Sequence, residues 1–306
     1  RHTVAGYRDA FGLLLRFAAQ RFKRVPSNLC LEDLDTSFLS DFLNHLEIDR
    51  HNCIRTRNNR LAALHAFFRY VYVNEPAYAL HCQRVLAIPA KRYDKRPVEF
   101  LTEKETVALL AAPDIGKWIG RRDRTLLFLA VETGLRNSEI TSLRHQDVEL
   151  GSGAHVRCFG KGRKMRCTPF RKELAAVLKQ WLAEQTGEPN DPLFPSSRGG
   201  PLSADALQRL VARHAANAGR VCPSLTGKTV RPHTLRHTAA MDLLRRGVDR
   251  SVIAMWLGHE STETTQIYLH ADMRLKEQAL AHATSKGVAP NRYHPKDSLL
   301  TFLESL

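Results

Sequence analysis

The sequence predicts a mainly α-helical protein of two domains, with a β-hairpin or small three-stranded sheet in the second. Amphipathic helical patterns recur along the 306 residues, and an apolar fraction of 43% is enough to fill two cores. Residues 88–98 interrupt these patterns with two prolines and several basic residues, which is typical of an extended linker. Two alternating segments, 154–159 and 165–170, flank Gly-Lys-Gly and indicate the hairpin.

Residues 1–87 are predicted to form a small helical domain. Apolar side chains recur at helical spacing in four segments, the first beginning with Val4 and Tyr7. The second segment has Asp35 or Thr36 as its N-cap and buries Phe38 to Leu46 on one face. The predicted helices cover residues 4–22, the segment from this cap to Leu46, residues 54–72 and residues 77–86.

Positive charge on the third helix and on the linker indicates a polyanionic partner. The chain carries a formal net charge of +15, and planar guanidinium groups bind phosphates well. Arginines on a helix in a DNA groove contact phosphates and base edges, although a solvated basic face explains the pattern equally well. The candidate DNA-binding residues are Arg55, Arg57, Arg60, Lys91, Arg92, Lys95, Arg96, Arg163 and Lys164.

Residues 99–285 are predicted to form the second domain. It begins at a capping box, Thr102 to Glu105, and Gly134 is expected to end the helix over 117–133 in a left-handed conformation. Arg198-Gly199-Gly200 is expected to finish a third strand. The remaining predicted helices cover 171–185, 204–218 after the Ser203 cap, a segment from about Thr234 to Gly247, a segment around Val252 to Gly258, 261–268 and 271–284.

Residues 286–306 are predicted to form a tether and a short amphipathic helix. This helix either folds back on its own domain or docks on a neighbouring protomer, and the sequence leaves both arrangements open.

Six residues, met in a fixed order, suit the cleavage of a phosphodiester. Arginines stay charged and donate in pairs to phosphate oxygens, and donors aimed at developing charge give large catalytic effects. A tyrosine hydroxyl, with an ordinary pKa of about 10, needs positive charge and a proton acceptor to attack phosphorus. The leaving alkoxide needs a proton from a positioned acid. The six candidates are Arg136, Lys161, His233, Arg236, His259 and Tyr268.

Three of these candidates, Arg136, Lys161 and Tyr268, also have a structural interpretation. Arg136 follows an apolar helix and can pair with Glu132, Glu139 or Asp147 for stability alone. Lys161 on a glycine-flanked turn can serve solubility, and Lys164 is the alternative lysine if the turn is displaced. An isolated tyrosine at a helix end is most often a core residue. The combination of motifs favours catalysis over these separate interpretations.

Four motifs occur in this order: Thr133 to Glu139, Gly160-Lys161-Gly162, His233-x-x-Arg236 and Leu257-Gly258-His259, followed by Tyr268. Together they resemble the motifs of the tyrosine recombinases, the phage-integrase and Xer-like family. The resemblance implies that Tyr268 is the nucleophile, that Lys161 is the hairpin lysine, and that Glu139 orients Arg136. It also implies a helical, SAM-like core DNA-binding domain in 1–87 and a catalytic domain of tyrosine-recombinase type in 99–285.

The resemblance further implies a recombinase or integrase, most typically of a mobile element, that cuts and rejoins DNA through a 3′-phosphotyrosyl intermediate. No metal, ATP or other cofactor is expected. The expected partners are double-stranded DNA and further copies of the chain, a dimer on each site and a tetramer in synapsis. The cysteines form no C-x-x-C pair and no apolar run is long enough for a membrane span, so a bacterial cytoplasm or nucleoid location is expected.

Three other functions remain open at this point. A type IB topoisomerase uses a similar catalytic set and relaxes DNA as a monomer. A catalytically silent DNA-binding protein retains the basic surface alone. A metallohydrolase is suggested by His233-x-x-x-His237 with His259 and His270, although this helix lacks the carboxylate of an H-E-x-x-H motif.

Overall fold

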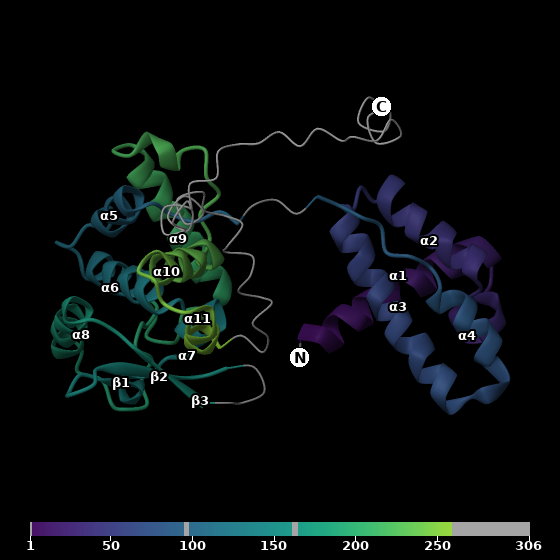
Figure 1. Cartoon of the computed structure of the whole chain (residues 1–306), viewed down its shortest axis with the longest axis horizontal. Helices are drawn as coiled ribbons and strands as arrows, with labels where there is room; N and C mark the ends of the chain where they lie inside the picture. The colour runs from purple at the N-terminus through teal and green to yellow at the C-terminus, as the bar shows by residue number, and fades with distance from the viewer. Residues whose placement is uncertain (1, 95–97, 161–164, 259–306) are drawn as a thin grey trace, which may run out of the picture. The chain divides into compact units, whose positions relative to one another are not determined.

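The computed structural model describes residues 2–94, 98–160 and 165–258, and the chain divides into two compact units, 1–96 and 97–306 (Figure 1). The described residues are mainly helical and include one three-stranded antiparallel sheet, which confirms the predicted fold class. The predicted segments 261–268, 271–284 and 298–306 lie outside the described residues. No helix in the described part is long and apolar enough to cross a membrane.

The first unit is a helical domain whose core lies between its helices. Asp35 is the N-cap of the second helix, where its Oδ1 accepts a hydrogen bond from the amide of Phe38 at 2.7 Å. The apolar face predicted for this helix is buried, at Phe38, Leu39, Phe42, Leu43 and Leu46. Val4 and Tyr7 in the first helix are exposed. The helices are α1 His2–Phe22, α2 Thr36–Ile48, α3 Ile54–Asn74 and α4 Ala79–Leu86, with 3-10 turns at Pro26–Asn28, Leu31–Asp33 and Pro76–Tyr78.

The second unit is built around α6, which packs against three other helices, α5, α8 and α10. The capping box predicted at the start of the second unit is present before α5. The Thr102 amide donates to Glu105 Oε2 at 2.8 Å, and the Glu105 amide donates to Thr102 Oγ1 at 3.3 Å. The α-helices are α5 Glu103–Ala111, α6 Trp118–Thr133, α7 Asn137–Ser142, α8 Lys172–Glu184, α9 Ala204–Gly219, α10 Pro232–Arg245 and α11 Arg250–Leu257, with 3-10 turns at His145–Asp147 and Pro223–Leu225.

The sheet forms one edge of the second unit (Figure 1). The predicted hairpin is confirmed as β2 His155–Phe159 paired antiparallel with β3 Met165–Pro169. The third strand is β1 Val148–Glu149, which pairs with β2 and precedes the hairpin. The expectation of a third strand ending at Arg198–Gly200 was therefore wrong, because this glycine-rich turn is closed by a single bridge between Pro195 and Pro201.

Buried polar contacts hold α10 and the segment before it against the start of the second unit. Glu105 is only 1% exposed and accepts hydrogen bonds from Ser224 Oγ and Lys228 Nζ, both at 2.7 Å. Burial alone raises the pKa of Glu105, but these hydrogen bonds outweigh it and lower the pKa to about 2. Thr238 on α10 accepts a hydrogen bond from the Leu101 amide at 2.9 Å. The helix that carries His233 and Arg236 is thus held in place from its buried side.

Candidate active site

Arg136 occupies the N-cap of α7, two residues after the left-handed Gly134 that ends α6. Its Nη1 donates to Glu139 Oε1 at 2.9 Å, and its Nη2 donates to the Gly258 carbonyl at 2.6 Å. The side chain keeps 28% of its surface exposed. Arg136 is therefore both anchored by an acid, as its structural interpretation required, and open to a ligand.

Glu139 is the buried acid that holds this arginine. Its carboxylate is 2% exposed and accepts from Arg136 twice, from the side chain and, at 2.7 Å, from the backbone amide. A second guanidinium, that of Arg166 on β3, donates to both carboxylate oxygens. Burial alone raises the pKa of Glu139, but the hydrogen bonds from Arg166 and Arg136 outweigh it and lower the pKa. Glu139 therefore stays ionised.

Arg236 lies on α10 and joins the ends of two other helices. It is 4% exposed, with Nη1 donating to the Gly134 carbonyl and Nη2 donating to the Leu257 carbonyl, each at 2.7 Å. Gly134 and Gly258 both adopt left-handed conformations that end their helices, so carbonyls near them lack helical partners. These carbonyls fix the guanidinium plane of Arg236 close to the position where Arg136 contacts Gly258.

His233 and His237 lie one turn apart on α10, with their rings stacked at a centroid distance of 6.2 Å. Partial burial, followed by the positive charges of Arg236 and Arg136, lowers the pKa of His233. Burial, followed by the charges of His233 and Arg236, lowers the pKa of His237 to about 4. Both rings are therefore neutral near pH 7, and a neutral imidazole nitrogen can accept a proton.

The titration of His237 predicts a loss of stability in mild acid. Between pH 8 and pH 5 the unfolded chain protonates this histidine, at a pKa near 6.5, while the folded chain does not. The free energy of unfolding is therefore expected to fall by about 2 kcal/mol more in the parent than in His237→Gln over this interval. Urea unfolding at both pH values measures the difference, and equal pH dependence in the two proteins would contradict it.

Several predicted site residues lie outside the described part of the chain. They are Lys161, Arg163, Lys164, His259, Tyr268, Lys95 and Arg96. The chain positions next to two of them are nevertheless defined. His259 follows Gly258, which accepts the hydrogen bond from Arg136, and Lys161 lies in sequence between the paired strands β2 and β3.

The predicted DNA-binding residues of the first unit divide by exposure. Arg55 and Arg92 are exposed and Arg60 is half-buried. Arg57 is only 6% exposed, and its Nε lies 3.2 Å from Glu47 Oε1. Lys91 Nζ contacts the other oxygen of the same carboxylate at 2.8 Å. The burial and ion pair of Arg57 give it a structural contact in place of the exposed, DNA-facing position expected from helical periodicity.

Arg166 is the residue of the site that the sequence interpretation missed. Strand β3 alternates between exposed Met165, Cys167 and Pro169 and the inward positions of Arg166 and Thr168. An arginine on the inward face of a strand needs buried acceptors, either an acid or backbone carbonyls. This alternation was the signal that could have identified it, although nothing in the sequence named Glu139 as the acid.

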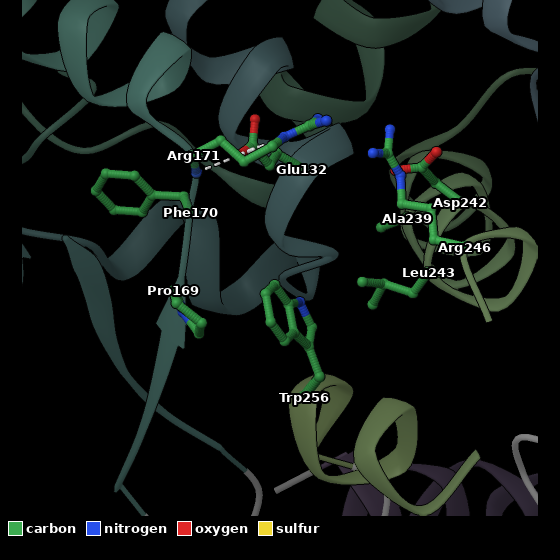
Figure 2. A pocket seen from close by; sticks show the side chains of 9 residues that line it. All are labelled: Glu132, Pro169, Phe170, Arg171, Ala239, Asp242, Leu243, Arg246 and Trp256. Atoms are coloured by element: carbon green, nitrogen blue, oxygen red, sulfur yellow. Dashed lines mark hydrogen bonds and ion pairs between the residues drawn. The ribbon is translucent and has the colours of Figure 1, made fainter. Parts of the chain in front are cut away.

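A surface pocket lies among the ends of β3 and α6 and the helices α10 and α11 (Figure 2). Trp256 and Phe170 contribute to its apolar wall, and Arg171 pairs with Glu132 beside it. Of the catalytic candidates in the described part of the chain, Arg136, His233 and Arg236, none lines this pocket. Within the described ranges, no group of three or more His, Cys, Asp or Glu side chains is placed to hold a metal ion.

Comparison with known proteins agrees with this geometry. Residues 99–274 match the model of the phage integrase family. The chain is 51% identical over 305 residues to the integrase/recombinase y4rC of Sinorhizobium fredii, covering 100% of this chain and 92% of that relative. It is 36% identical to the tyrosine recombinase XerD of Pseudomonas putida, covering 78% of this chain and 80% of XerD.

A solved structure with the same architecture is the XerH site-specific recombinase bound to palindromic difH substrate, in a post-cleavage complex. The TM-score is 0.72 at 25% sequence identity, and the match covers 89% of this chain and 78% of XerH. The family match spans more than half of the chain, and the identity to curated relatives extends over most of it. The chain therefore belongs to the phage integrase family of tyrosine recombinases, enzymes that cut and rejoin DNA.

Proposed function

We propose that this chain is a site-specific DNA recombinase or integrase that works through a 3′-phosphotyrosyl intermediate on Tyr268, without metal or ATP. The observation that carries the proposal is the meeting of Arg136 and Arg236 at the end of α11. His259 is the next residue after that end, and Tyr268 follows nine positions later. Two anchored guanidinium groups at this position suit a scissile phosphate and its developing charge.

In the proposed reaction the Tyr268 oxygen attacks phosphorus and the bond to the 5′ oxygen breaks. His233, which is neutral near pH 7 because its pKa is lowered, takes the tyrosine proton. Lys161 gives a proton to the leaving 5′ oxygen, while Arg136 and Arg236 bind the non-bridging oxygens and His259 donates to the phosphate. A 5′ hydroxyl from another strand reverses the step, because the phosphotyrosyl bond conserves the phosphodiester energy.

The proposed arrangement on DNA uses both units. Residues 1–87 are assigned to core-site binding, 88–98 to a basic linker, 99–285 to catalysis and 286–306 to a C-terminal tether and helix. The exposed side chains of Arg55 and Arg92 are proposed to contact phosphates of the DNA backbone. XerH is bound to a palindromic site in its complex. A dimer of this chain on each site, and a tetramer when two sites meet, follow as proposals.

The test is the recovery of protein-linked DNA. The parent chain and Tyr268→Phe are expressed in cells and purified under denaturing conditions, and any attached DNA is sequenced. Adducts are expected from the parent alone, at paired sites with inverted arms. Equal adducts from both proteins would remove Tyr268 as the nucleophile. Scattered cut sites would favour a type IB topoisomerase, and no adduct from either protein would contradict DNA cleavage in those cells.

A further inference from the structure

Arg166 on β3 forms a two-pronged ion pair with the acid of the candidate site. Its Nη1 lies 2.7 Å from Glu139 Oε1, and its Nη2 lies 2.8 Å from Glu139 Oε2. The arginine side chain is 13% exposed and the glutamate side chain 2%. Parallel bonds from one guanidinium to both oxygens fix the carboxylate plane, which a single bond leaves free to rotate. The carboxylate that holds Arg136 is therefore oriented from the sheet.

Arg166 also packs against Gly258. A Cβ atom at Gly258 would lie 2.6 Å from Arg166 Nη1 and 3.2 Å from its Cδ and Cζ atoms, so the arginine occupies the space a side chain would need. The carbonyl of the same glycine accepts from Arg136 Nη2. Arg166 thus touches both groups that hold the Arg136 guanidinium, the Glu139 carboxylate and the Gly258 backbone.

We propose that Arg166 is a positioning residue that sets the Arg136 guanidinium for the scissile phosphate. It acts through Glu139 and Gly258 and does not itself contact the DNA. The proposal rests on the proposed function and adds a second arginine that shares the acid of the first. One carboxylate balances only one of these two guanidinium charges, so the cluster retains a positive charge suited to a phosphodiester.

The test compares strand cleavage on two DNA substrates after the target site has been read from the adducts. Each substrate carries a nick that lets the cut strand leave, and the scissile group is a natural phosphate in one and a neutral methylphosphonate in the other. The proteins are the parent, Arg166→Met, Arg166→Lys and Arg136→Ala. The matched control is Arg157→Met, which removes an exposed arginine of β2 that bonds the Gln146 carbonyl.

Arg166→Met is expected to cut the natural phosphate about 10- to 100-fold more slowly than the parent, because small misplacement of a catalytic group is costly. On the methylphosphonate the deficit should shrink to a few-fold, as for Arg136→Ala, because the neutral group has less charge to balance. Arg166→Lys keeps the charge but cannot make two parallel bonds, so it should fall between the parent and Arg166→Met. Arg157→Met should cut like the parent.

Three results would overturn the assignment. One is an unchanged rate in Arg166→Met, and another is a deficit of equal size on both substrates. If Arg166→Met does not fold, Arg166→Lys decides, and parent-like cleavage by that folded variant would also reject the positioning role. If the parent chain forms no adduct, the proposed function fails, and this proposal fails with it. That outcome is seen with the parent chain alone, whereas the three results above require a parent that cleaves DNA.

Discussion

Glu139→Gln is expected to lower the free energy of unfolding by about 3 to 5 kcal/mol, because the substitution leaves two guanidinium groups without their buried counterion. The parent carboxylate is 2% exposed and accepts from Arg136 and Arg166. A glutamine offers one acceptor oxygen and turns an amide donor towards the other guanidinium. Typical domains have a total stability of about 5 to 15 kcal/mol, so the expected loss is a large fraction of the total. Urea unfolding of the purified parent and variant measures this loss.

The matched control is Glu184→Gln, which breaks a more exposed pair. Glu184 also faces an arginine, Arg121, with Nε 2.9 Å from each carboxylate oxygen, but the two side chains are 30% and 39% exposed. Water replaces the lost contact there, so the loss of stability is expected to be much smaller than in Glu139→Gln. Equal losses in the two variants would show that burial of Glu139 does not make its charge structurally important.

Local interactions account for what the sequence predicted well. The Asp35 cap, the capping box at Thr102 and the left-handed Gly134 each depend on groups within four residues in the chain. The hairpin is similarly local, because its two paired strands are separated by only five residues in the sequence. Such features are visible in sequence since the interacting groups lie close together in it.

The contacts that were missed join residues far apart in the chain. Arg166 and Glu139 are separated by 27 positions, and Arg136 and Gly258 by 122. Helical periodicity also placed Arg57 on an exposed face, although its side chain is buried and forms an ion pair with the carboxylate of Glu47. The residue types of the candidate site were predicted from motifs, but their acceptors, two carbonyls and one shared carboxylate, depend on tertiary packing.

Arg236→Lys is expected to slow strand cleavage by about 100- to 1000-fold while changing DNA affinity only a few-fold. The lysine keeps the positive charge, so the electrostatic attraction to the DNA backbone is retained. It loses the fork that donates to the Gly134 and Leu257 carbonyls, each at 2.7 Å. One ammonium cannot reproduce that plane, and at least one buried carbonyl loses its partner at a cost of about 1 to 3 kcal/mol.

The control for this substitution is Arg246→Lys. Arg246 is exposed and follows the last residue of α10. Arg246 pairs with Asp242 at 3.0 Å across one helical turn, so a lysine there keeps both the charge and an equivalent partner. Cleavage by this variant should match the parent in single-turnover assays, with binding measured in parallel by titration of the same DNA. Cleavage by Arg236→Lys within a few-fold of the parent would show that charge alone suffices at this position. The two helix-end carbonyls would then serve only to hold the fold, because the orientation they impose on the guanidinium would have no effect on the reaction.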